Sequence, residues 1–187
     1  MSFADAVRVL NVLKRRRVIR DYALIGAVAA TAYMEPMFTE DLDIIVLADT
    51  DEEYLQTFRR VAEFAEGREG MHYTLGGVPV QMFPTATKPL YRHTLEKARR
   101  ARIGGLRAKI ASPEHLILLY LEAFRDKDRF RIGRLLPVAD MVQVRTLLER
   151  FDDEEKRLAH RLQTLLPAGF PGEGEVAPSP GADEPRT

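Results

Sequence analysis

The sequence predicts an α+β protein in which a small mixed β-sheet with flanking helices is followed by a helical C-terminal part. Short runs rich in β-branched residues alternate with segments of helical periodicity through the first part of the chain. A Gly76-Gly77 pair separates two extended runs, which is typical of a β-hairpin. From Ser112 to residue 166 only helical patterns follow. Strands followed by a block of helices indicate the α+β class.

The first part of the chain contains the predicted central strand. Ser2 is expected to cap the N-terminus of the first helix. Thr50 lies in a run of three polar residues, any of which could cap the helix that is predicted directly after the central strand. In order, we expect an amphipathic helix at 3–17, a strand at 22–25, a helix of small residues after Gly26, a central strand at 42–48, and a helix from about residue 51 to 65.

The second part begins with the predicted hairpin. Ser112, Pro113 and Glu114 form a strong helix start, because they combine a hydroxyl cap, a proline in the first turn and an acid near the helix N-terminus. The helix that follows is apolar on nearly all sides and is expected to be deeply buried. The other expected elements are a basic helix at 88–102, a short edge strand at 107–111, and helices at 127–136, 142–150 and 154–166.

Three regions follow from these elements: an α/β core at 1–111, a helical part at 112–166 and a tail at 167–187. The tail is rich in proline and glycine and has few large apolar residues, so we expect it to be disordered. The chain of 187 residues has enough apolar residues, at 45%, for a proper core.

Composition excludes several classes of protein. The formal net charge is zero, so no global field attracts nucleic acid. No apolar stretch is long enough to span a bilayer, and no signal peptide is visible, so no membrane partner is expected. The chain has no cysteine, which fits a cytoplasmic protein. Nothing in the sequence sets the oligomeric state.

The stretch FTEDLDIIVL brings two carboxylates, Asp41 and Asp43, to the start of the central strand. Residues two apart on a strand project to the same face, so these carboxylates would lie side by side. Two interpretations are open: a solvated strand entry, or a site for a cation. Hard divalent cations such as Mg²⁺ prefer carboxylate oxygens and commonly add a substrate phosphate to them.

Gly26 and Ala27 lie fifteen residues before Asp41, where the first strand turns into a helix. A glycine there would let the backbone approach a phosphate. The alternative is a turn that needs glycine for its own conformation. The histidines, by contrast, have no ligand spacing, and each is expected to be a structural or surface residue: His72, His93, His115 and His160.

The stretch LIGAVAATAYMEPMFTEDLDIIVL resembles the opening of the nucleotidyltransferase superfamily, which has a polymerase-β-like fold. More narrowly, the chain resembles the AbiEii-type toxin and related bacterial nucleotidyltransferase-like proteins. GGVPVQMFPT, IASPEHLILLYLEAF and RDKDRFRIGRLL are similar to later segments of that group. The resemblance covers roughly residues 20–140 and would make 1–111 a nucleotidyltransferase-like core.

The resemblance implies roles for individual residues. Gly26 and Ala27 would hold the phosphates of a nucleotide, and Thr39 would lie beside the acids. Asp41 and Asp43 would be the catalytic residues that bind Mg²⁺, or Mn²⁺, together with a nucleoside triphosphate (NTP). Arg125 or Lys127 would steady a phosphate.

The same resemblance implies a third carboxylate that acts as general base, and here this sequence departs from the family. The matching position in VPVQMFP is Gln81. An amide cannot accept a proton at neutral pH. Tyr120 similarly stands near a position where the family often has a lysine, and Arg131 lies where an acid is expected.

Three hypotheses about function remain open at this point. The first is an enzyme that transfers a nucleoside monophosphate from an NTP to a hydroxyl of RNA, protein or a small molecule. The second is a degenerate binding or regulatory module for nucleotide, RNA or a protein partner, such as one half of a toxin–antitoxin pair. The third is a chance motif in an unrelated α/β domain. Another carboxylate that fills the gap at Gln81, such as Glu40 or Asp128, would favour the enzyme, and its absence would favour the binding module.

Overall fold

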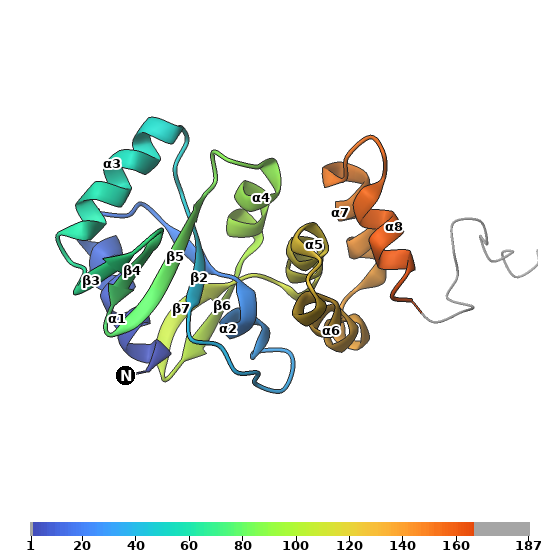
Figure 1. Ribbon diagram of the computed structural model, residues 1–187, viewed down its shortest axis with the longest axis horizontal. Helices are drawn as coiled ribbons and strands as arrows, with labels where there is room; N and C mark the ends of the chain where they lie inside the picture. The colour runs from blue at the N-terminus through green and yellow to red at the C-terminus, as the bar shows by residue number, and fades with distance from the viewer. Residues whose placement is uncertain (1, 167–187) are drawn as a thin grey trace, which may run out of the picture.

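A seven-stranded mixed sheet forms the centre of the computed structural model, which describes residues 2–166 (Figure 1). The strands lie in the order β3-β4-β5-β2-β1-β7-β6. Their bounds are β1 Tyr22–Leu24, β2 Leu42–Val46, β3 Gly67–Glu69, β4 His72–Leu75, β5 Val78–Pro84, β6 Arg99–Ile103 and β7 Leu106–Ile110. The predicted tail at 167–187 lies outside the described residues.

Helices cover both faces of the sheet. The helices of this part are α1 Phe3–Arg15, α2 Gly26–Ala30, α3 Asp51–Ala62 and α4 Pro89–Lys97. On one face, Phe58 of α3 packs on Tyr73 of β4 with ring centroids 4.5 Å apart. On the other face, Tyr91 of α4 packs on Phe83 of β5 at 5.9 Å. Helix α1 lies on the same face as α3, since Arg16 stacks over the ring of Phe64 just beyond α3. Helix α2 contacts β2, with Gly26 against Asp43.

Strand β2 is the central strand that the sequence predicts. It pairs with β1 in antiparallel and with β5 in parallel orientation. Leu42, Ile44 and Val46 are fully buried, in accord with their position in the middle of the sheet. Asp43 and Ile45 alternate with them and therefore face α2 and α4.

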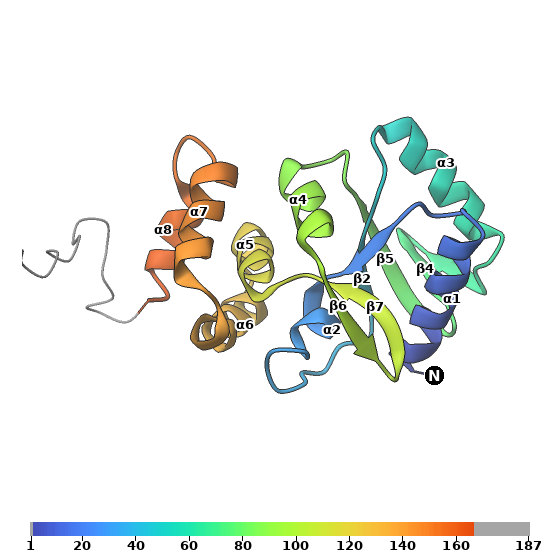
Figure 2. The same cartoon turned by 180° about the vertical axis from the view of Figure 1, so that it is seen from behind.

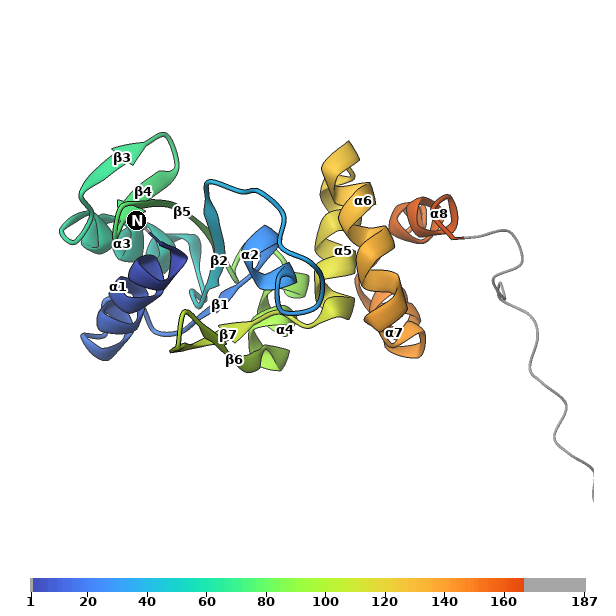
Figure 3. The ribbon, with the colours of Figure 1, turned by 90° about the horizontal axis from the view of Figure 1, so that it is seen from below.

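The C-terminal helices form a separate layer beside α2, as Figures 2 and 3 show from two further sides. They are α5 Pro113–Ala123, α6 Asp126–Leu135, the short 3₁₀ helix η1 Leu136–Val138, α7 Met141–Phe151 and α8 Arg157–Gln163. Helix α5 is buried along most of its length, as its apolar sequence predicts, and contacts α2, α6, α7 and α8. The side chain of Ser112 caps it by accepting a hydrogen bond from the backbone N–H of His115. None of the described helices is long and apolar enough to cross a membrane.

Two sequence predictions about the 88–111 region are wrong. The helix ends at Lys97, and residues 99–103 form strand β6, which pairs with β7 across a second Gly-Gly turn. Gly104 and Gly105 both have positive φ, at 53° and 81°, as a tight hairpin requires. Strand β7 is therefore not an edge strand, because β6 covers it. Strand β3 was also not predicted; its three residues are all exposed and have no apolar pattern.

Candidate functional site

The turn between β1 and α2 brings its backbone directly against Asp43. The N–H of Ile25 donates a hydrogen bond of 2.9 Å to the backbone oxygen of Asp43. Gly26 follows with φ +62°, and a Cβ at this position would overlap the Asp43 carboxylate. Residue 26 must therefore be glycine for two reasons: a left-handed conformation and the space that the carboxylate occupies.

The two acids of the D-x-D pair lie at the start of β2. The hydroxyl of Thr39 donates a 2.7 Å hydrogen bond to Oδ1 of Asp41, which places Thr39 beside the acids as the sequence predicts. Partial burial and the nearby charge of Asp41 raise the pKa of Asp43 to about 6, well above the usual 3.8. The pair thus carries negative charge that the described side chains only partly compensate, which favours the interpretation as a cation site over a solvated strand entry.

Gln81 is the direct neighbour of Asp43 on the adjacent strand. The parallel pairing of β2 with β5 sets Asp43 opposite Gln81, and the antiparallel pairing of β5 with β4 sets Gln81 opposite His72. Laterally paired residues lie on the same face of a sheet, about 4.8 Å apart per strand. Strand pairing thus builds a polar row across the sheet, made of Asp43, Gln81 and His72, and Glu69 of β3 continues it.

Arginines from α6 and its N-cap face these acids from the helical side. The hydrogen bonds of Arg125 to Asp128 raise its pKa, and the charges of Asp43 and Asp41 act in the same direction. The charges of Arg125 and Arg131 in turn act to lower the pKa of Asp43, although burial outweighs them. Lys127 is exposed on the first turn of α6, and it is not among the charges that shift the pKa of Asp43.

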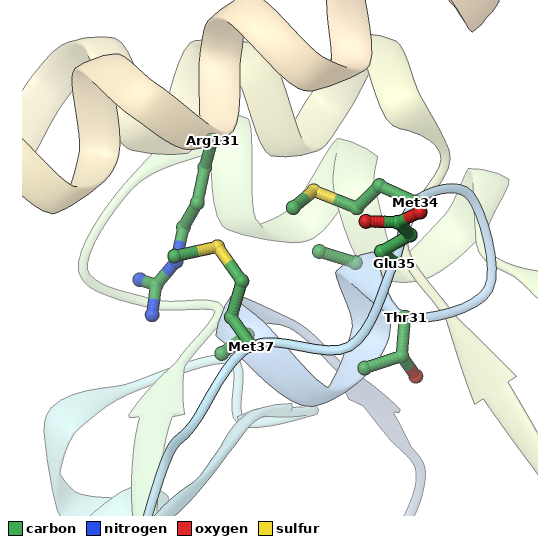
Figure 4. Close-up of a pocket in the computed structure, with 7 residues that line it drawn as sticks. Thr31, Met34, Glu35, Met37 and Arg131 are labelled. Carbon is green, nitrogen blue, oxygen red and sulfur yellow. The ribbon is translucent and has the colours of Figure 1, made fainter.

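Arg131 is a member of the site that the sequence did not predict. Its side chain is only 7% exposed, and it extends from α6 toward Met37 and α2, where it lines a narrow pocket with Ala27 (Figure 4). Arg131 Nε and the hydroxyl of Tyr120 on α5 are two of the three buried side-chain polar atoms without a hydrogen-bond partner among the described residues. Such orphaned donors are costly unless a ligand or water satisfies them.

The donor set fits one divalent cation rather than two. Asp41 and Asp43 are two carboxylates on one rigid strand entry, which suits a Mg²⁺ ion that shares its coordination with substrate phosphates. Within residues 2–166 no three acidic or histidine side chains gather as a metal site. Asp128 does not fill the gap at Gln81, because it is fully buried and accepts hydrogen bonds from Arg125 at 2.7 Å and Arg131 at 3.4 Å. Glu40 is exposed.

Comparison with solved structures supports the assignment of the fold. No protein-family model matches the chain, and no curated protein matches it by sequence. An antigenic nucleotidyltransferase-like protein from Paracoccidioides brasiliensis aligns over 88% of both chains with a TM-score of 0.56 and 20% identity. ANT(2'')-Ia, solved in complex with adenylyl-2''-tobramycin, aligns over 84% of this chain and 96% of its own with a TM-score of 0.55 and 14% identity. The chain has a nucleotidyltransferase-like fold.

Proposed function

We propose that this protein binds a magnesium-bound nucleoside triphosphate and transfers its nucleoside monophosphate to a hydroxyl group. One observation carries the proposal: acids from β2 and arginines from the α6 region converge beside the Gly26 backbone from distant parts of the sequence. A negative pair that attracts a cation, next to positive side chains that attract phosphate, is the arrangement that a metal-bound triphosphate requires.

Each group has a distinct task in the proposed reaction. Asp41 and Asp43 hold the cation, which when bound neutralises charge on the phosphates. Arg125 and Arg131 bind the phosphate oxygens from the helical side, since arginine matches their geometry. Gly26 lets the backbone come close to them. The acceptor oxygen attacks the α-phosphorus, the bond from that phosphorus to the bridging oxygen breaks, and pyrophosphate leaves with the electron pair.

The acceptor is the finer part of the proposal. ANT(2'')-Ia was solved with an adenylylated small molecule, which supports a small-molecule hydroxyl as one class of acceptor. RNA and protein hydroxyls are the other acceptor classes that the sequence leaves open. The chain also resembles AbiEii-type toxins in sequence. That grouping, and a role in a toxin–antitoxin pair, stay predictions that the acceptor found in the assay below will test.

A specific observation supports a second candidate function. The residue opposite Asp43 on β5 is an amide, Gln81, and the described residues supply no third carboxylate. A protein that binds the metal-bound nucleotide without transferring it would have this arrangement. Such a module would change its state on nucleotide binding and pass that change to a partner.

Label transfer distinguishes the two functions. The wild-type protein is incubated with α-labelled NTPs and Mg²⁺ or Mn²⁺ in the presence of RNA, protein and small-molecule fractions of an extract. We expect label on one fraction, and none with a variant that carries both Asp41→Asn and Asp43→Asn. Nucleotide-dependent thermal stabilisation that needs both acids, without label transfer, would instead establish the binding module. Absence of both results would contradict any nucleotide function.

Arg131→Met is expected to weaken nucleotide binding, because it removes the buried guanidinium while roughly conserving side-chain volume. Hydrogen bonds to charged groups contribute about 1.5–3 kcal/mol, so the dissociation constant should rise about 10- to 100-fold. Titration calorimetry with a non-hydrolysable NTP and Mg²⁺ measures it. Arg134→Met, an exposed position on the same helix, is the matched control. Equal affinity in both variants would remove Arg131 from the site.

A further inference from the structure

The polar row contains one imidazole, to which the proposed reaction has so far assigned no task. His72 begins β4, lies opposite Gln81 and is partly buried. It lies close enough to Asp43 that a positive charge on the imidazole acts to lower the pKa of that carboxyl. On its far side, Glu69 of β3 is its lateral partner. An imidazole therefore stands one strand beyond the position where the family has its general base.

The transfer reaction needs a proton acceptor that Gln81 cannot supply. The hydroxyl must lose its proton as it attacks, and an amide has no basic lone pair for it at neutral pH. Asp128 is held by two arginines. Histidines elsewhere are engaged or remote: the rings of His93 and His115 hydrogen-bond to each other at 2.9 Å. Imidazole is the side chain most often used as general base near neutral pH.

We propose that His72 accepts the proton of the attacking hydroxyl and so takes over the task of the missing third carboxylate. The inference rests on the proposed transfer activity. As the new bond forms between the acceptor oxygen and the α-phosphorus, the hydroxyl proton moves to a ring nitrogen of His72, and pyrophosphate leaves. The imidazolium then returns the proton to solvent. Histidine has a longer reach than aspartate, which helps it to act across the position of Gln81.

A groove between the start of α3 and β5 adjoins the polar row at Gln81 and gives the acceptor a place to bind. It has a volume of about 360 Å³, and Met71, the residue before His72, also lines it. Its lining is largely apolar, and Asp51 is its only charged residue among the described ones. Neither Arg125 nor Arg131 lines this groove, so an acceptor bound there would leave the proposed phosphate contacts in place.

The test compares His72→Asn and His72→Gln with the wild-type protein and with His160→Asn, an exposed position on α8. We expect kcat to fall about 10²-fold or more in both His72 variants, while the nucleotide dissociation constant and the thermal midpoint stay unchanged. The dependence of kcat on pH should also flatten. Because the carboxylates of Asp41, Asp43 and Glu69 lie in the same region, the decisive comparison is between the pH profiles of proteins that differ only at residue 72.

Two other outcomes are informative in different ways. If the wild-type protein transfers label and both His72 variants match it in kcat and pH profile, the His72 proposal is overturned and the transfer activity stands. If the wild-type protein transfers nothing, the proposed transfer activity is overturned, and the task assigned to His72 with it. His72→Gln keeps the test usable if the shorter asparagine disturbs the start of β4.

Discussion

Asp43→Asn is expected to abolish nucleotide transfer and, at the same time, to stabilise the nucleotide-free protein at neutral pH. The folded protein holds the proton of Asp43 more tightly than the unfolded chain does, since its pKa is about 6 instead of 3.8. The ionised carboxylate therefore lowers the free energy of unfolding above pH 6, and this penalty disappears as the pH falls below 3.8. At about 1.4 kcal/mol per unit, the penalty is at most about 3 kcal/mol.

Denaturant unfolding of the two proteins at several pH values measures this effect. The variant should be more stable at pH values above 6, and the two should converge toward acid pH. Added Mg²⁺ and nucleotide should stabilise the wild type alone, because only its paired carboxylates bind them. Asp49→Asn is a suitable control, since the carboxylate of Asp49 is exposed and paired with Arg20 and Arg92 outside the site. If Asp43→Asn were less stable than the wild type at pH 8, the Asp43 carboxylate would be a group that stabilises the fold and not one kept for binding a cation.

Gln81→Asp is expected to raise the rate of transfer about 10²-fold, because it puts a carboxylate where the attacking hydroxyl must lose its proton. The strand register makes this expectation specific: residue 81 is the lateral neighbour of Asp43, so the new carboxylate would join the pair on the same face. The gain should persist when His72→Asn is added, since the new base replaces the imidazole. Without metal, the third negative charge should lower stability through repulsion.

Steady-state transfer in four proteins measures this: the wild type, Gln81→Asp, Gln81→Asn and the double variant with His72→Asn. Gln81→Asn is the matched control, because it has the size of aspartate without its charge. A higher transfer rate in both Gln81→Asp and Gln81→Asn would show that the smaller side chain, and not the new negative charge, speeds the reaction. No rise in either would show that the face above Gln81 is not where the acceptor hydroxyl lies.

Much of the fold was predictable because its signals are local. The β-branched run at 42–48, the Gly76-Gly77 turn and the Ser112 helix start each depend on a few neighbouring residues, and the structure confirms all three. The missed strand β6 had a comparable signal in Gly104-Gly105. There the run of basic residues was interpreted as a helix face, and only pairing with β7 decides in favour of a strand.

Some residues of the candidate site were likewise predictable from local sequence, and others were not. Gly26, Asp41, Asp43 and Gln81 were singled out from motif and spacing, and the structure brings them together around the start of β2. Once the segment is extended, the spacing of Asp41 and Asp43 sets two carboxylates beside each other. The place of Lys127 in a motif stays a prediction about its role, and the structure adds that its side chain is exposed on α6.

The sequence by itself determined the fold class, the acid pair and the amide at position 81. Only the tertiary structure decided that Arg131 is buried near the acids and that His72 stands beside Gln81. The physical reason is that a helix hides or exposes a residue according to what packs on it, and a strand acquires its neighbours by long-range pairing. No short stretch of the sequence predicts the burial of an arginine on α6 or the register of three strands.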